Sequence, residues 1–495
     1  MAAKTISKSQ YMMGLQCVKR LWLYNFRKDL IPPTPPGQQL LFDQGTEVGI
    51  LAHKYFKNGR LVAYDYNQLP QAIKETKELL NNGIEIIYEG TFVFNNVLVR
   101  CDVMKKNGSG AWNLIEVKSA TDVKDEYYQD TAIQKYVLEG SGLHIDNVQL
   151  MHINNRFVKK GDIDPTSFFV LKNITKEAAV QQRGIDANVK TFMKALSDNV
   201  HEPDIEIGPH CSAPYLCEFQ DYCWKDIPTY SIYDIPNLSW KKKNELKVMG
   251  IMNVKDVPDN FALTENQRTY VQVDKIGQPH INKTRISDFI KELEYPIYFI
   301  DFETIMTAIP LYDGSSPYQQ IPFQLSLHVQ NKPNGELTHA GYLGDGKTDP
   351  RPGLILFMLE NIGAKGSLMA YNATFEALRI KEMANDFPAY NKQLLEMTER
   401  IKDLIQPFRQ HSYVHPKFYG SNSLKDVLPA LCPNIPSYNG MSIANGGDAQ
   451  VAYLNILSGK LSGKEVAKTR LDLEKYCSKD TESMVEILAH LYKLF

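Results

Sequence analysis

The chain has 495 residues, of which 43% are hydrophobic and 23% charged, and its formal net charge is −2 at pH 7. These values are typical of a folded globular protein of two to four domains, and the sequence contains no low-complexity tract or repeat. Because the net charge is close to zero, any surface that binds nucleic acid has to be local.

The start of the sequence and its cysteines indicate a cellular compartment. Residues 1–8 lack the apolar core of a secretory signal, and no apolar run approaches the length of a membrane span. We therefore expect a cytoplasmic protein that does not enter a membrane. Seven cysteines are then better candidates for metal binding than for a disulfide framework.

The first predicted element is a helix over residues 11–24 that carries Cys17. Lys19, Arg20 and Trp22 lie beside this cysteine in the sequence. Positive charge next to an aromatic ring is suited to contacts with a single nucleic-acid strand, so these residues are candidates for nucleic-acid binding.

A second helix is predicted over residues 42–56, with His53 among apolar neighbours. A lone histidine in such a position is most often a core or surface residue without a special role. On the residues alone, His53 is therefore a weak candidate for a metal ligand.

A meander of three antiparallel strands is predicted next, and a helix follows it. The strands cover residues 90–94, 97–104 and 112–119. Glu116 and Lys118 share one face of the third strand, and Asp102 on the neighbouring strand can reach the same place. Two carboxylates and a lysine suit metal-assisted hydrolysis of a phosphodiester, although an exposed cross-strand ion pair has the same pattern. The helix carries Gln134 and Tyr136, which we expect to face this site.

Three cysteines stand at regular spacing near the end of the first half of the chain. Cys211, Cys217 and Cys223 form a C-x5-C-x5-C pattern, and Cys17 can complete a set of four thiolates. Four thiolates suit either zinc or an iron–sulfur cluster, and zinc sites more often have C-x2-C pairs. The alternative is that these are unrelated buried thiols.

Residues 17–223 as a whole resemble RecB-type nucleases of the PD-(D/E)XK superfamily. The likeness is closest to the branch with an iron–sulfur cluster, as in the AddB and CRISPR-adaptation nucleases. The sequence departs from that branch in the x5 spacing of its first C-terminal cysteine pair and in the short Gln-x-Tyr motif of the helix. The resemblance implies a [4Fe-4S] cluster on Cys17, Cys211, Cys217 and Cys223, metal ligation by His53, Asp102 and Glu116, and active-site roles for Lys118 and Gln134.

A small helical segment is expected to link the two halves of the chain over residues 229–292. It carries the basic cluster Lys241, Lys242 and Lys243. The short helices ending at glycine resemble a helix-hairpin that grips phosphates, and a solvated basic helix end explains the same pattern equally well.

An apolar strand ending in Ile300-Asp301-Phe302-Glu303 follows this linker. Because side chains alternate along a strand, Asp301 and Glu303 share one face while Phe302 points to the other. Burying two bare carboxylates is costly, and hard divalent cations such as Mg²⁺ or Mn²⁺ would relieve that cost. An exposed strand end would also carry such a pair.

Two later stretches add to this pair of acids. Glu376 falls in the first turn of a predicted helix, and Tyr476 and Asp480 are one turn apart on the C-terminal helix. Four acids from several elements are what a two-metal site requires, and Tyr476 is placed to orient water.

These three stretches resemble the DEDD exonuclease superfamily of the ribonuclease H-like fold, in its tyrosine-bearing DEDDy branch. The resemblance implies metal-dependent 3′→5′ hydrolysis of a nucleic acid, with two metal ions held by Asp301, Glu303, Glu376 and Asp480. Glu376 stands where that family usually has aspartate. Ser423 to Lys425 resembles a polar patch near the substrate, so Lys425 is a candidate for nucleic-acid binding.

Together the elements predict an α/β protein with two nuclease domains. The expected domains are 1–228, RecB-like; 229–292, helical linker; and 293–495, DEDD exonuclease-like. This order resembles a bacterial family whose C-terminal half is described as a domain of unknown function. The expected substrate is DNA, as single strands or ends, cleaved with Mg²⁺ or Mn²⁺ at both sites. RNA as the substrate, a single active site beside a strand-holding domain, and a non-enzymatic scaffold remain alternatives.

Overall fold

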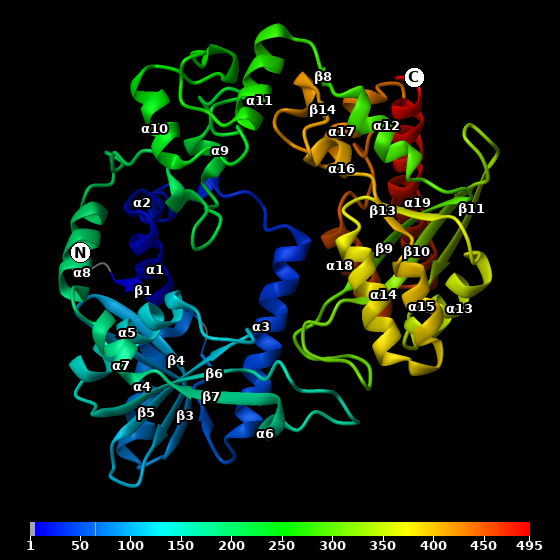
Figure 1. Ribbon diagram of the computed structural model, residues 1–495. Helices are drawn as coiled ribbons and strands as arrows, with labels where there is room; N and C mark the ends of the chain where they lie inside the picture. Colours follow the sequence, from blue (N-terminus) through cyan, green and yellow to red (C-terminus); the bar gives the residue numbers. More distant parts are fainter. Residues whose placement is uncertain (1–4, 65) are drawn as a thin grey trace. The chain divides into compact units, whose positions relative to one another are not determined.

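The computed structural model describes residues 5–64 and 66–495, and the protein is α/β, as the sequence predicts (Figure 1). The chain forms two compact units. Unit 1 comprises Met1–Asp226 and Thr307–Gln319, and unit 2 comprises Ile227–Met306 and Gln320–Phe495. The segment expected as a linker, residues 229–292, is part of unit 2.

A seven-stranded sheet forms the centre of unit 1, in the order β2-β3-β4-β5-β6-β7, with β1 parallel to β4. The strands are β1 (Ile6–Ser7), β2 (Arg60–Leu61), β3 (Ile86–Phe94), β4 (Val97–Lys106), β5 (Trp112–Lys118), β6 (Ile145–Ile153) and β7 (Phe169–Asn173). β3, β4 and β5 are the predicted antiparallel meander. Asn95 and Asn96 turn between β3 and β4 with φ of 45° and 61°, a left-handed conformation that asparagine tolerates.

The helices of unit 1 differ from prediction at one functional position. They are α1 (Lys8–Gln16), α2 (Val18–Phe26), α3 (Pro36–Tyr55), α4 (Leu69–Asn81), α5 (Asp125–Gly140), α6 (Pro165–Phe168), α7 (Thr175–Gln181), α8 (Ile185–Ser197) and α9 (Gln220–Cys223). The single helix predicted over residues 11–24 is wrong, because Cys17 adopts an extended conformation (φ −163°, ψ 120°) between α1 and α2. Cys17 is therefore a non-helical residue between two helices, and its side chain does not follow the regular direction of helical side chains.

A five-stranded mixed sheet forms the centre of unit 2, in the order β11-β10-β9-β12-β13. The strands are β9 (Ile297–Ile305), β10 (Ile321–Gln330), β11 (Leu337–Leu343), β12 (Ser367–Ala370) and β13 (Ile401–Asp403), and β8 (His280–Ile281) pairs separately with β14 (Tyr413–Val414). β9 is antiparallel to β10 and parallel to β12. This mixed sheet is compatible with the expected ribonuclease H-like fold.

Unit 2 also contains a series of helices, of which the longest, α19, packs against β9 and β10. They are α10 (Trp240–Val248), α11 (Glu265–Ile276), α12 (Lys283–Lys291), α13 (Arg351–Asn361), α14 (Thr374–Asp386), α15 (Asn391–Thr398), α16 (Gln406–Arg409), α17 (Leu424–Leu431), α18 (Gly446–Leu457) and α19 (Gly463–Tyr492). Short 3₁₀ helices are η1 (Lys28–Leu30), η2 (Tyr66–Gln68), η3 (Pro209–Cys211), η4 (Val254–Asp256), η5 (Pro388–Tyr390) and η6 (Pro416–Phe418). Ser462 and Glu465 form a capping box that starts α19. None of the helices in the described ranges has the length and apolarity needed to cross a membrane.

Candidate metal-binding sites

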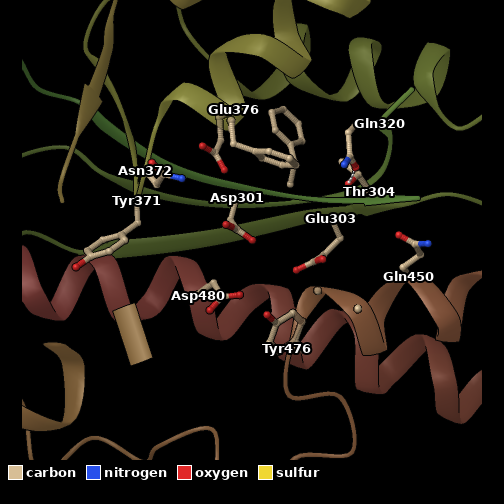
Figure 2. A pocket seen from close by; sticks show the side chains of 14 residues that line it. Asp301, Glu303, Thr304, Gln320, Tyr371, Asn372, Glu376, Gln450, Tyr476 and Asp480 are labelled. Carbon is tan, nitrogen blue, oxygen red and sulfur yellow. Dashed lines mark hydrogen bonds between the residues drawn. The ribbon is translucent and has the colours of Figure 1, made fainter. Parts of the chain in front are cut away.

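The acids predicted in the second half of the chain meet in one pocket of unit 2, with a volume of about 370 Å³. Asp301 and Glu303 come from β9, Glu376 from the first turn of α14, and Tyr476 and Asp480 from α19. Figure 2 shows these side chains pointing into a shared space between the strand and the helices.

Local structure explains how three elements deliver these side chains. On β9 the alternation of faces sends Phe302 into the core, where it is 4% exposed, and leaves its two acidic neighbours on the pocket side. The turn before α14 passes through Asn372, which has a φ of 67° and donates its backbone N–H to Asp403 Oδ1 at 2.9 Å. On α19, Tyr476 and Asp480 are one helical turn apart, as predicted.

The carboxylates of this pocket have abnormal pKa values because they are held away from water and close to one another. Burial raises the pKa of Glu303 to about 8, and the charge of Asp480 adds to this shift. Burial also raises the pKa of Glu376 to about 8 and that of Asp480 to about 6. The pKa of Asp301 is raised well above its usual value by desolvation and by the charges of Asp480 and Glu303.

This donor set fits hard divalent cations. Glu303, Glu376 and Asp480 are only 6%, 3% and 7% exposed, and Glu376 Oε2 is a buried oxygen without a hydrogen-bond partner. Within the described ranges, no lysine or arginine forms a salt bridge with any of the four acids. A cluster of buried oxygen ligands that forms no ion pair with a described lysine or arginine is suited to Mg²⁺ or Mn²⁺.

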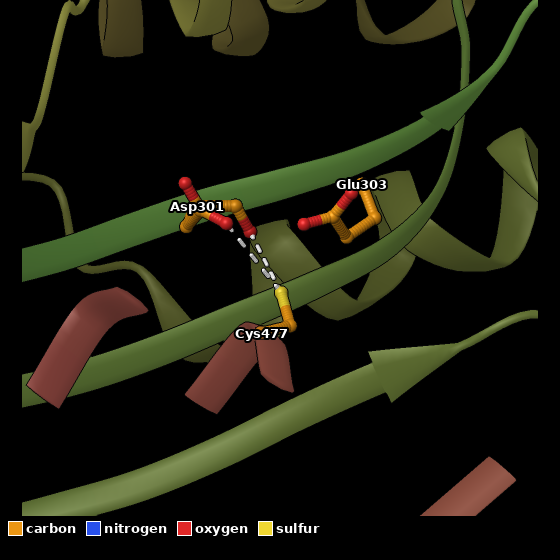
Figure 3. A group of neighbouring side chains, drawn as sticks. All are labelled: Asp301, Glu303 and Cys477. Carbon is orange, nitrogen blue, oxygen red and sulfur yellow. Dashed lines mark hydrogen bonds between the residues drawn. The ribbon is translucent and has the colours of Figure 1, made fainter. Parts of the chain in front are cut away.

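Asp301, Glu303 and Cys477 form a possible metal-binding triad, since one ligand atom of each lies within 4.8 Å of the others (Figure 3). The Cys477 thiol donates to the backbone oxygen of Asp301 at 3.5 Å and to its Oδ2 at 3.7 Å. The spacing of the cysteines predicts no role for Cys477. Its place on α19, directly after Tyr476, was the available signal.

Two further polar residues stand beside the acids. Tyr438 was not predicted, and its hydroxyl donates to Asp480 Oδ1 at 2.5 Å. Lys425, a predicted binding residue, holds its ammonium 5.3 Å from the ring centroid of Tyr438 and 5.7 Å from that of Tyr476. A cation therefore lies close to the tyrosine side of the pocket, and its charge lowers the pKa of Glu303 and Asp480 against the effect of burial.

The acids and the lysine predicted in the first half of the chain are also brought together, inside unit 1. Lys118 Nζ donates to Glu116 Oε1 at 2.7 Å, and Gln134 Nε2 donates to Glu116 Oε2 at 2.7 Å. Asp102 Oδ2 accepts the backbone N–H of Val117 at 2.7 Å. Desolvation and the charge of Glu116 raise the pKa of Asp102 to about 8.

Lys8 and Asp130 belong to this cluster and were missed from the sequence. Lys8 Nζ lies 2.8 Å from Glu116 Oε1 and 3.1 Å from Asp130 Oδ1. Lys118 Nζ lies 2.5 Å from Asp130 Oδ2. Burial opposes ionisation of Asp130, but the two ammonium groups overcome this and hold its pKa well below the usual range. Asp130 precedes Gln134 by one turn of α5, which was a usable signal, whereas Lys8 is 108 residues from Glu116.

Two other predicted residues of unit 1 lie differently. The His53 ring stacks on Tyr88 with centroids 4.2 Å apart, and burial lowers its pKa. Metal ligation by His53 stays a prediction. The expectation that Tyr136 faces the site is wrong, because its hydroxyl bonds to Asp186 at 2.5 Å and to Asn95 at 2.8 Å. Tyr136 is two residues beyond Gln134, roughly 200° around the helix, so the two cannot share a face.

Four cysteines line one pocket of unit 1, as their spacing predicts: Cys17, Cys211, Cys217 and Cys223. None of these four cysteines forms a disulfide bond. Burial raises the pKa of Cys217 to about 11, and burial together with the charge of the neighbouring Cys211 raises the pKa of Cys17. Four thiols from separate segments around one pocket fit a thiolate-bound metal centre.

The basic residues proposed to hold nucleic acid are partly engaged inside the protein. Lys19 pairs with Glu202 and Arg20 with Glu218, each at 2.8 Å, and both cations line the cysteine pocket. On α10 the linker lysines differ from one another. Lys241 is exposed, Lys242 donates to Ala262 O at 2.5 Å, and Lys243 donates to Tyr233 O at 2.9 Å.

The chain matches one described family over a segment that belongs mostly to unit 2. Residues 298–423 match the family described as a domain of unknown function (DUF2779). The matched segment includes Asp301, Glu303 and Glu376 and ends before Tyr476 and Asp480.

The chain is also similar to three proteins described as uncharacterized. UU173 of Ureaplasma parvum serovar 3 is 26% identical over 296 residues, which are 54% of this chain and 42% of that protein. The MG366 homolog of Mycoplasma pneumoniae is 29% identical over 231 residues, and MG366 of Mycoplasma genitalium is 26% identical over 215 residues. These two matches cover 43% and 40% of this chain. The chain spans between 32% and 42% of the length of these relatives.

Proposed function

We propose that this protein is a metal-dependent nuclease that hydrolyses phosphodiester bonds of DNA at single strands or ends. The observation that carries the proposal is the convergence of Asp301, Glu303, Glu376 and Asp480 on one pocket of unit 2 without a protein cation among the described residues that pairs with them. The resemblance to DEDDy exonucleases assigns 3′→5′ polarity to this site.

The residues of unit 2 would have separate roles in such a reaction. The four acids would hold two divalent ions, Mg²⁺ or Mn²⁺, which supply water activation and charge stabilisation when bound. Tyr476 would orient the attacking water, because its hydroxyl reaches into the pocket one turn from Asp480. Tyr438 fixes the Asp480 carboxylate by its hydrogen bond, and Lys425 adds positive charge for the phosphate backbone.

We also propose a second nuclease site, of RecB type, in unit 1. Asp102 and Glu116 would hold its metal, with His53 completing the set implied by the resemblance, while Lys118 would steady the phosphate and Gln134 would orient Glu116. We propose that Cys17, Cys211, Cys217 and Cys223 bind a [4Fe-4S] cluster that joins the two ends of this domain.

Degradation of end-labelled oligonucleotides tests the proposal. Single-stranded and duplex DNA and matching RNA would be labelled at either the 3′ or the 5′ end and incubated with Mn²⁺ or Mg²⁺. We expect shortening from the 3′ end of DNA that requires the metal. Faster loss of RNA would favour the ribonuclease alternative, since the 2′-hydroxyl is the feature that separates the two substrates.

Two variants serve as controls for that assay. Asp301→Asn keeps the size of the side chain but removes a charged ligand, so it should lower the rate of 3′ shortening by about 10²–10³-fold or more. Asp288→Asn changes an exposed acid of unit 2 outside the pocket and should leave the rate unchanged. Equal rates for wild type and Asp301→Asn would reject the unit 2 site.

A further inference from the structure

Three donors from the protein already bond to the Glu116 carboxylate in unit 1. Its Oε1 accepts from the ammonium groups of Lys8 and Lys118 at 2.8 and 2.7 Å, and its Oε2 accepts from Gln134 at 2.7 Å. The side chain of Glu116 is 2% exposed, so water adds little to this set.

Asp130 is held by the same three donors. Lys8 lies 3.1 Å from its Oδ1, Gln134 donates to that oxygen at 3.1 Å, and Lys118 lies 2.5 Å from its Oδ2. Two lysines therefore bridge two buried carboxylates. The remaining charged groups that face this cluster are Asp102, whose Oδ2 accepts the N–H of Val117, and Glu89, which pairs with Arg100 at 2.8 Å.

Lys8 and Lys118 reach these acids in different ways. Lys118 is two residues from Glu116 on the same face of β5, so it stays beside that acid whatever else is bound. Lys8 is the first residue of α1, a separate element, and reaches the acids only through its long side chain. Its ammonium is the more exchangeable of the two.

The acids of unit 2 differ from Glu116 in their protein partners. The acids of the unit 2 pocket form no salt bridge among the residues that the structure describes, whereas Glu116 is bonded to two ammonium groups. An ammonium at 2.8 Å from a carboxylate oxygen occupies space that a divalent ion bound to that oxygen would need. A divalent ion bound to Glu116 Oε1 would therefore have to displace an ammonium group.

We propose that Lys8 is a built-in counter-ion of the unit 1 site, which holds Glu116 and Asp130 together and is exchanged for the divalent ion when that site loads. This inference rests on the proposed nuclease function of unit 1 and adds a regulation of its metal affinity. The unit 1 site would then fill at higher metal concentration than the unit 2 site.

Binding of Mn²⁺ to the full-length protein tests the exchange, with free Mn²⁺ followed by electron paramagnetic resonance. All proteins would carry Asp301→Asn and Asp480→Asn to weaken the unit 2 site, and the part of the binding that Glu116→Gln removes defines the unit 1 site. Lys8→Met should bind Mn²⁺ there about tenfold more tightly, as expected for the loss of a competing ligand. Lys77→Met, at an exposed lysine of α4, is the matched control and should not change the affinity.

Thermal unfolding gives a second readout that a purely structural lysine would not produce. Lys8→Met should unfold at lower temperature than its parent in EDTA, and saturating Mn²⁺ should remove or reverse that difference. Lys8→Gln removes the charge but keeps a hydrogen-bond donor, and it provides the same comparison if the methionine variant does not fold.

The outcomes separate this inference from the proposed function. Equal or weaker Mn²⁺ binding by Lys8→Met, with the same loss of stability in EDTA and in Mn²⁺, would overturn the exchange while the unit 1 metal site stands. If Glu116→Gln removes no bound Mn²⁺ from either protein, the metal site of unit 1 is wrong and the exchange falls with it.

Discussion

At the scale of single residues, the pKa of a buried carboxylate is raised or lowered according to whether a protein cation is bonded to it. Glu303 and Glu376 have pKa values raised to about 8 because desolvation is not offset by a bonded cation. Asp130 is also buried, but Lys118 and Lys8 hold its pKa well below the usual range. A buried acid that stays without a counter-charge is a better sign of a ligand site than an acid within a salt-bridge network.

The raised pKa values predict how stability depends on pH in the absence of metal. Between the unfolded pKa of a glutamate and about 8, the folded protein binds more protons than the unfolded chain, so stability falls as pH rises through this range. Glu303→Gln removes one of these groups and should raise the free energy of unfolding by about 1–3 kcal/mol at pH 8 in EDTA. Chemical denaturation at pH 5 and pH 8 measures this difference. If Glu303→Gln left the pH dependence of the unfolding free energy unchanged, the pKa of Glu303 would not be raised in the folded protein.

The hydrogen bond from Tyr438 to Asp480 predicts a shift in the pH profile of the proposed nuclease reaction. This bond favours the ionised carboxylate, so its loss in Tyr438→Phe should raise the pKa of Asp480. The acidic limb of the rate profile for 3′ shortening should then move to higher pH, with a smaller change at the optimum. Tyr419→Phe, at a tyrosine that is 50% exposed, is the control. A uniform fall in rate at every pH would instead indicate that Tyr438 only supports the fold.

At the scale of elements, the sequence predicts the helices and strands that are determined by local residue patterns. The meander β3–β5, the helix start at Thr374 and the long α19 follow from strand alternation, turn residues and helical spacing, and they carry most of the candidate site. The interruption at Cys17 was not predictable, because residues 11–24 have a continuous helical pattern and only the tertiary position of the thiol requires the break. Lys8 and Tyr438 reach their acids across 108 and 42 residues, with no local signal.

Replacing Cys17 tests the proposed centre of four thiolates. Cys17→Ser should reduce the iron and acid-labile sulfide bound by anaerobically purified protein to near zero and lower the unfolding temperature of unit 1, because the proposed cluster would link segments at its two ends. Cys432→Ser, in unit 2, should leave both properties unchanged. Zinc in place of iron and sulfide in the wild-type protein would correct the identity of the centre and keep the four ligands.

At the scale of the whole molecule, the chain combines two compact units, each with its own cluster of acids. The α/β class and the grouping of the acids were predictable because each site draws on residues whose spacing on a strand or helix fixes their face. The assignment of residues 229–292 to unit 2 was not predictable, since it depends on long-range packing. Two independent sites predict two activities that separate by mutation.

The release of label from the 3′ end of single-stranded DNA in Mn²⁺ tests the central claim most directly, with wild type, Asp301→Asn and Glu116→Gln compared side by side. We expect Asp301→Asn to lower the rate of 3′ release by about 10²–10³-fold or more, as for the loss of a group that stabilises the transition state. Glu116→Gln should preserve 3′ release and remove any other cut. Release at the wild-type rate by Asp301→Asn, or no release by any protein, would contradict a two-metal exonuclease site in unit 2.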